Sequence, residues 1–179
     1  MKNNETIALD LIIQWEGPEI NQSSAEPGGI SKYGISLTTY ADYCKKANLP
    51  IPTTQTIADL TETDARNFYQ IVFLPAIRFD DLLSGIDVRL VDISVNLGIT
   101  GGINLLQMVL MQYPLTDIIS DDLIKLLNTY DPKAVLLALS TGWISNKHTH
   151  PSWVTYGHGW MNRNISVHQS TLKLIGITS

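Results

Sequence analysis

The sequence predicts a mainly α-helical protein with at most one small β-hairpin. Apolar residues recur every three or four positions along most of the 179 residues, which is the period of a helix that buries one face. Sustained alternation of apolar and polar residues, the pattern of a half-buried strand, is almost missing. With 44% hydrophobic residues, the chain can bury a core for one domain or for two small lobes that share an interface.

The N-terminal part predicts two helices joined by a glycine-rich turn. Apolar residues repeat with helical spacing over residues 7–15, and Gly17-Pro18 ends this helix. Ser36 can cap a second helix that runs to about residue 48. Turn residues fill the stretch 20–36 between them, and a short hairpin is expected there.

The middle of the chain predicts two more helices. Thr61 and Asp64 form a weaker version of the capping box, and the helix that they start ends at Pro75. Residues 86–97 are apolar almost all round, as expected of a helix at the centre of a fold, and Gly98 ends them.

The C-terminal part predicts four helices. One starts at Gly101-Gly102, and a short one covers residues 120–128. Asp131-Pro132 is a good pair of cap and first-turn residues for a helix that extends to about Trp143. The periodicity is mixed after Pro151, and we place a last helix there.

Composition excludes several kinds of partner and location. The 12 Lys and Arg residues against 17 Asp and Glu give a net charge of −5, and no basic stripe could bind a phosphate backbone, so nucleic acid is not expected as a partner. The longest apolar runs fall short of a membrane span, and the N-terminal segment lacks the basic start and cleavage site of a signal peptide. The lone Cys44 cannot form an internal disulfide, which suits a protein made in the cytoplasm.

Glu16, at the end of the first predicted helix, is the main candidate for a catalytic group. A carboxyl group at a helix C-terminus faces unpaired carbonyl groups, and Trp15 can shield it from water. Both effects favour the protonated form, which a general acid needs in order to protonate a glycosidic oxygen. Glu26 lies in a turn that Pro27-Gly28-Gly29 can fold back, so it is the candidate second carboxylate, and Ser31 could orient a water molecule.

Spacing alone leaves a simpler interpretation open. A glutamate before Gly-Pro at a helix end is more often a surface carboxylate beside a helix stop. Glu19 in the same loop also competes with Glu26 for the role of second carboxylate. The residues by themselves do not choose between a surface loop and an active site.

The same stretch resembles a known signature. EG-x-x-x-N followed by PGG-x-S-x-x-G-I-S is similar to EGGY-x-ND-x-x-DPGG-x-T-x-x-GIT of the glycoside hydrolase family 108 muramidases, also called secretion-activator or lysozyme-like proteins. FLPAIRFDDL is similar to the family's WDPARCDDLP, VDISVNLGITGGINLLQ to FD-x-AVN-x-G with a helix ending in LQ, and HGWMNR to GWxNR. The resemblance is greatest to members linked to typhoid toxin secretion.

The resemblance implies a lysozyme-like helical fold and a role for three residues. The family's catalytic glutamate falls on Glu16, its aspartate before PGG on Glu26, and its threonine after PGG on Ser31. Pro18 and Glu19 replace a glycine and a tyrosine of the signature, and the loop before PGG is one residue longer. These departures leave the role of Glu16 intact and affect the reach of the second carboxylate.

Three further residues are expected to contact the substrate. Tyr33 and Trp160 could stack on sugar rings, and Asn96, polar within an apolar helix, could form a hydrogen bond with the sugar. The alternatives are core packing for the two aromatic residues and a bridge between helices for Asn96. The four histidines suggest a zinc amidase only weakly, because neither an H-E-x-x-H spacing nor an acidic ligand accompanies them.

The resemblance implies an N-acetylmuramidase that cleaves between N-acetylmuramic acid and N-acetylglucosamine in peptidoglycan, without a metal or organic cofactor. Residues 1–90 would form the catalytic lobe and residues 91–179 a helical peptidoglycan-binding lobe, or both would form one compact unit. The expected task is local remodelling of the wall for toxin or protein secretion. A phage-type endolysin and a catalytically inactive peptidoglycan-binding module are the alternatives.

Location and partners follow from the same expectation. We expect a monomer that is made in the cytoplasm and acts on periplasmic peptidoglycan. Since no signal peptide is recognised, it would reach its substrate by a route of its own, with a holin or a secretion-system partner.

Overall fold

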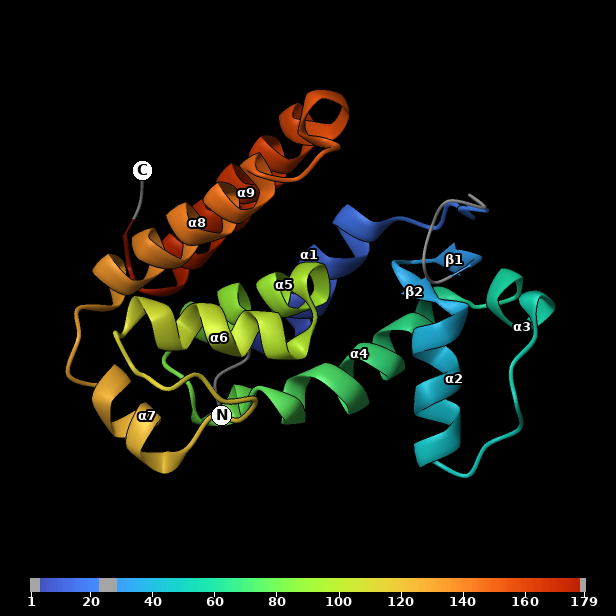
Figure 1. Cartoon of the computed structure of the whole chain (residues 1–179), viewed down its shortest axis with the longest axis horizontal. Coiled ribbons are helices and arrows are strands. Elements are labelled where there is room, and N and C mark those ends of the chain that lie inside the picture. The colour runs from blue at the N-terminus through green and yellow to red at the C-terminus, as the bar shows by residue number, and fades with distance from the viewer. Residues whose placement is uncertain (1–3, 23–28, 178–179) are drawn as a thin grey trace. The chain divides into compact units, whose positions relative to one another are not determined.

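Helices dominate the computed structural model, which describes residues 4–22 and 29–177 (Figure 1). Two short strands, β1 (Ser31–Lys32) and β2 (Ile35–Ser36), form an antiparallel hairpin, and η1 (Phe79–Asp81) is a short 3-10 helix. This architecture confirms the predicted mainly α-helical class with a small hairpin. The α-helices are α1 (Asn4–Glu16), α2 (Leu37–Lys46), α3 (Thr54–Ala58), α4 (Glu62–Ala76), α5 (Ile86–Leu97), α6 (Ile99–Val109), α7 (Asp121–Leu127), α8 (Pro132–His148) and α9 (Trp153–Leu174).

Most helix boundaries coincide with their sequence signals. The side chains of Ser36, Ser120 and Asp131 each accept a hydrogen bond from a backbone N–H in the first turn of α2, α7 and α8. Gly98, with φ of 78°, separates α5 from α6 as expected of a glycine at a helix end.

Two helices differ from their predicted extents, and a third was not predicted. The short α3 was not predicted, since five residues are too few for a helical period; reciprocal hydrogen bonds between Thr53 and Thr56 start it. The helix predicted from Gly101-Gly102 begins two residues earlier, at Ile99, and α8 continues past Trp143 to His148.

The predicted capping box at the start of α4 is formed. The Thr61 hydroxyl donates to the Asp64 carboxylate at 2.6 Å, the Thr61 N–H donates to the same oxygen at 2.9 Å, and the Asp64 N–H donates to Thr61 Oγ1 at 3.2 Å. The side-chain bond from Thr61, followed by the backbone bond, holds the pKa of Asp64 below its usual value.

Replacing Thr61 by alanine is expected to lower the free energy of unfolding by about 1 kcal/mol at pH 7. Because the pKa of Asp64 is lower in the folded state, its contribution is complete above the unfolded pKa and is lost as the pH falls through the folded pKa. Urea denaturation of wild type and Thr61→Ala at neutral and acidic pH measures this. A difference in stability that stays constant into acid would contradict the prediction.

Two compact units can be distinguished along the chain. The smaller covers residues 9–72, with the hairpin, α2 and α3, and the larger contains the start of α1 and the chain from Phe73 onward. The expected lobes, residues 1–90 and 91–179, stay a prediction. None of the helices in the described ranges has the length and apolar character needed to cross a lipid bilayer.

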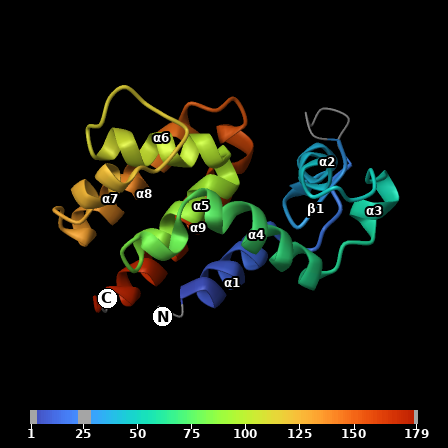
Figure 2. The same cartoon turned by 90° about the horizontal axis from the view of Figure 1, so that it is seen from below.

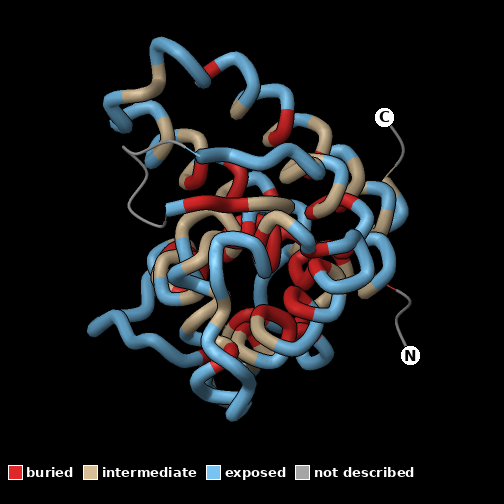
Figure 3. Tube along the Cα trace, turned by 90° about the vertical axis from the view of Figure 1, so that its right-hand side faces the viewer, coloured by how far each residue is buried: buried red, intermediate tan, exposed pale blue. Residues whose placement is uncertain are grey.

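Within the larger unit, α5 packs against α6, α8 and α9 (Figures 1 and 2). Its residues 86–94 are all buried, as the apolar pattern predicts, and such buried positions are red in Figure 3. The α8 and α9 helices run alongside each other and contribute Leu136, Leu139 and Val167 to the core.

Buried charges tie α5 to α9. The Asp92 carboxylate accepts hydrogen bonds from Arg163 Nε at 2.9 Å and from Arg89 at 3.3 Å, and Arg89 also donates to Asn164. Burial lowers the pKa of Arg89 to about 10, against the opposing effect of Asp92 and with the help of Arg163, so Arg89 keeps its charge at neutral pH. Since these charged groups are taken out of water, the cost of their desolvation offsets much of the attraction between them.

Substitution by alanine is expected to have opposite effects on stability at two glycines in helices of the larger unit. A Cβ at Gly102 would lie 3.0 Å from Ser94 Cα and closer still to Ser94 Oγ, whereas at Gly159 the described residues place no atom within 4 Å. Gly102→Ala is therefore expected to destabilise the fold by about 1–3 kcal/mol, and Gly159→Ala to stabilise it by about 0.5–1 kcal/mol. Urea denaturation measures both, and equal effects of the two substitutions would contradict the packing of α6 on α5.

Candidate active site

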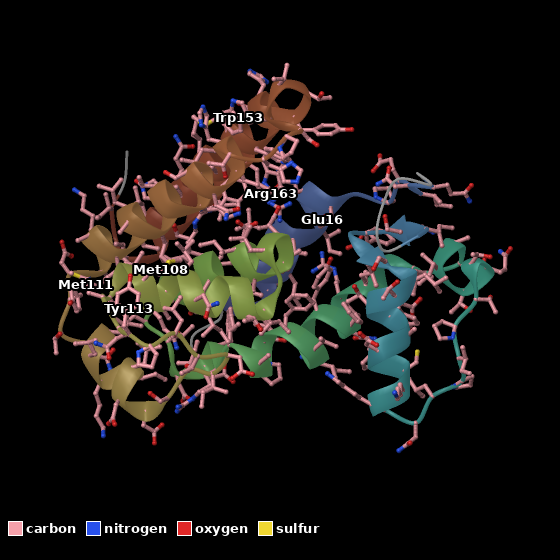
Figure 4. All side chains as sticks on the ribbon, in the orientation of Figure 1. Glu16, Met108, Met111, Tyr113, Trp153 and Arg163 are labelled. Carbon is pink, nitrogen blue, oxygen red and sulfur yellow. The ribbon has the colours of Figure 1, made fainter. Side chains whose placement is uncertain are left out.

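Glu16 is the last residue of α1 (Figure 4). Gly17, with φ of 67°, turns the chain away from the helix, and its N–H donates to Ile13 O at 3.0 Å. The helix end therefore presents a half-buried carboxyl group at a fixed position of the smaller unit.

The hairpin of the same unit has a two-residue turn made by Tyr33 and Gly34. Lys32 pairs with Ile35, and the two turn residues have φ of 51° and 73°. Positive φ at both positions defines a type I′ turn, for which Asn-Gly is the preferred sequence. Gly34 adopts this conformation freely, whereas for Tyr33 it costs about 1 kcal/mol.

The turn lies against the carboxyl group of Glu16. A Cβ added to Gly34 would lie 2.7 Å from Glu16 Cδ, closer still to Glu16 Oε2, and 2.8 Å from the hydroxyl of Tyr69. The missing side chain of Gly34 thus leaves the space in which the carboxyl group lies. The Tyr69 hydroxyl donates to Tyr33 O at 2.7 Å, so the phenol holds the turn at the same point.

Other contacts anchor the hairpin within its unit. Asn21 and Ser31 exchange backbone hydrogen bonds of 2.9 Å in both directions, and Lys32 Nζ donates to Ala58 O at 2.8 Å. These contacts join the loop after α1 to β1 and the hairpin to the end of α3.

The remaining residues predicted for the catalytic loop differ in how they are placed. Ser31 lies in β1 and is buried. Glu26 lies outside the described residues. Glu19, the rival second carboxylate, is exposed and folds back over Gly17, where an added Cβ would lie 3.4 Å from Glu19 Cδ. Glu16, Ser31 and Tyr33 thus belong to one unit and one local structure.

Asn96 belongs to the larger unit. Its side-chain amide donates to Asp92 O at 2.9 Å, one turn earlier in α5, and the residue is half-buried. This hydrogen bond does not bridge two helices, because both of its partners lie on α5. The expected contact of Asn96 with substrate stays a prediction.

Trp160, also in the larger unit, is half-buried in an aromatic cluster on α9 and the turn before it. Lys147 Nζ lies 5.0 Å from its ring centroid, a cation–π distance. Trp153, labelled in Figure 4, also lines a cavity of about 560 Å³ with Ile144 and Met161. The rings around Trp160 are His150 at 5.6 Å, Tyr156 at 6.0 Å and Trp153 at 6.1 Å between centroids.

The arrangement around Glu16 suits proton transfer to an oxygen atom of a ligand. A carboxyl group at a helix C-terminus, backed by a glycine turn and next to a buried phenol, has a fixed position and a partly dry environment. Within residues 4–22 and 29–177, no group of three or more His, Cys, Asp or Glu side chains is placed to hold a metal ion.

Two residues of this site were missed at the level of sequence. Tyr69 of α4 is not among the predicted site residues, and it is only 1% exposed. A signal was present, because the hydroxyl of a buried tyrosine nearly always has a hydrogen-bond partner. Gly34 was noted only as a hairpin residue, and its closeness to Glu16 follows from tertiary packing alone.

Comparison with known proteins adds independent findings. Residues 9–98 match the family described as Glycosyl hydrolase 108. Among solved structures, that of Brucella abortus SagA aligns with a TM-score of 0.83 at 20% sequence identity and covers 97% of each chain. This likeness shows a shared fold. No curated protein matches the sequence.

Proposed function

The chain belongs to the glycosyl hydrolase 108 family, and from this membership we propose that it is an N-acetylmuramidase that cleaves the bond between N-acetylmuramic acid and N-acetylglucosamine in peptidoglycan. Membership of the family makes it a glycoside hydrolase. The polymer and the bond are our proposal, and they rest on the signature around Glu16.

The structural observation that carries the proposal is the position of the Glu16 carboxyl group. It lies at the end of α1, against Gly34 of the hairpin turn. A glycoside hydrolase needs a carboxylic acid that protonates the leaving oxygen while a second carboxylate activates water or stabilises the transition state. In our proposal Glu16 is the general acid. Glu26 is the second carboxylate, and Ser31 helps to position water.

Sugar contacts in this proposal come from Tyr33, Asn96 and Trp160. Tyr33 forms the turn beside Glu16 and its half-buried ring can stack on a pyranose face. Asn96 and Trp160, which belong to the larger unit, are proposed to contact sugar through the amide oxygen and the indole ring. The net charge of −5 gives no long-range attraction to an anionic wall, so short-range stacking and hydrogen bonds must provide the affinity.

The proposed task is local opening of the wall for secretion of a toxin or another protein. The enzyme would act as a monomer in the periplasm and would reach it with a secretion-system or holin partner. To cut glycan without destroying the cell, only a limited amount of the enzyme can reach the wall. In this proposal the secretion-system or holin partner limits that amount.

A wall-binding module without catalysis is the second candidate, because Pro18 and Glu19 depart from the family signature beside Glu16 and Glu19 folds over Gly17. Release of reducing sugar from purified sacculi, measured together with co-sedimentation of the protein, separates the two. The proposal predicts that the protein releases reducing sugar continuously until the sacculi are consumed. Binding to sacculi without release of sugar would overturn it in favour of the binding module.

A further inference from the structure

The turn that backs Glu16 has an unfavourable sequence. A type I′ turn requires positive φ at both central residues, and Tyr33 occupies the first of them with φ of 51°. Residues other than Gly, Asn and Asp rarely adopt this backbone conformation. Local sequence preference alone therefore does not hold Gly34 where it lies.

A hydrogen bond from outside the hairpin meets the turn at Tyr33. Tyr69 on α4 donates its hydroxyl proton to Tyr33 O at 2.7 Å, across 36 residues of sequence. The ring of Tyr69 is 1% exposed and makes an edge contact with Phe68 at 5.6 Å between centroids. A buried, packed ring has little freedom, so the position of its hydroxyl is well defined.

The same hydroxyl lies beside the carboxyl group. The point where a Cβ of Gly34 would lie is 2.8 Å from Tyr69 Oη and 2.7 Å from Glu16 Cδ. The phenol, the turn and the carboxyl group therefore meet at Gly34. Movement of the turn would change the space that is left for the carboxyl group.

We propose that Tyr69 is a positioning residue for Glu16: its hydroxyl holds the strained Tyr33-Gly34 turn, and the turn fixes the carboxyl group for proton transfer. This inference rests on the proposed glycosidase function. Tyr69 acts through Tyr33 O and Gly34. It is therefore expected to affect the rate of the chemical step more than the affinity for glycan.

Tyr69→Phe removes the hydroxyl and keeps the packed ring, so native far-UV circular dichroism is expected. Reducing-sugar release from sacculi should show kcat lowered about 10- to 100-fold and KM changed less than about threefold, because a displacement of about 1 Å at a reacting group costs this much. Tyr43→Phe is the matched control, since its ring also packs on Phe68, at 5.6 Å, and it should keep its activity. The assay is repeated at lower temperature to test whether partial unfolding causes the loss of kcat in Tyr69→Phe. A loss caused by unfolding would disappear well below the melting temperature.

A rescue variant separates turn positioning from a general structural role. Tyr33→Asn installs the preferred Asn-Gly turn and removes the need for an external hydrogen bond. The factor by which Tyr69→Phe lowers kcat should therefore be at least about fivefold smaller in the Tyr33→Asn background than in the wild-type background. Because Tyr33 is also a proposed sugar contact, Tyr33→Asn alone is expected to raise KM, and the comparison uses only the ratio of the two kcat values within each background.

The outcomes distinguish the two proposals. An inactive wild type would overturn the proposed function itself. An active wild type with undiminished kcat in Tyr69→Phe would overturn only the role of Tyr69. An equally large loss of kcat on Tyr69→Phe in the Tyr33→Asn background would also overturn it, because the turn would then not be the link.

Discussion

Glu16→Gln is expected to reduce sugar release from sacculi by about 1,000-fold or more while the protein stays folded. Glutamine keeps the shape of the side chain and cannot donate an acidic proton to the leaving oxygen, and loss of a general acid costs about 100- to 10,000-fold. Because the two side chains are nearly isosteric, the substitution adds no volume at the half-buried end of α1. Circular dichroism and thermal melting establish that the fold is kept.

Glu19→Gln is the matched control for this variant. Glu19 lies in the same loop, and its carboxylate folds over Gly17. It should retain most of the wild-type activity. Loss of turnover in Glu19→Gln together with an active Glu16→Gln would mean that the catalytic acid has been assigned to the wrong carboxylate.

Gly34→Ala is expected to lower activity about 100-fold and to destabilise the smaller unit by about 1–3 kcal/mol. The new Cβ would lie 2.7 Å from Glu16 Cδ and 2.8 Å from Tyr69 Oη, so the carboxyl group must move, and φ of 73° is unfavourable for alanine. The measurements are kcat for sugar release and urea denaturation.

Gly176→Ala controls for the backbone effect alone. Gly176 has φ of 80°, close to that of Gly34, and no atom of the described chain lies within 4 Å of its added Cβ. It should lose less stability than Gly34→Ala, because no clash is added, and little kcat. Equal kcat losses in the two variants would contradict the contact between the turn and Glu16.

The sequence predicted those parts of the fold that depend on local signals. The N-caps at Ser36 and Asp131 and the apolar periodicity identified most helices, and the turn residues after Gly17 indicated a hairpin. Each of these signals involves residues within one helical turn or one loop. The five-residue α3 escaped prediction because its start depends on Thr53 and Thr56 alone.

The candidate site could be predicted only in part, because its contacts join distant segments. Glu16 stood out through its position at a helix end and through the family signature. Its closeness to Gly34 and Tyr69 depends on how α4 packs beside the hairpin, and no periodicity encodes that. The partner of Asp92 was similarly hidden, since Arg163 lies 71 residues later in the chain.

The most direct test of the central claim is the identity of the sugar at the new reducing end. Fragments released from sacculi by the wild-type protein are reduced with borohydride, and the sugar alcohol at the reduced end of each fragment is identified by tandem mass spectrometry. The account predicts the alcohol of N-acetylmuramic acid from wild type and none from Glu16→Gln. The alcohol of N-acetylglucosamine, or peptide release without any new reducing end, would contradict it.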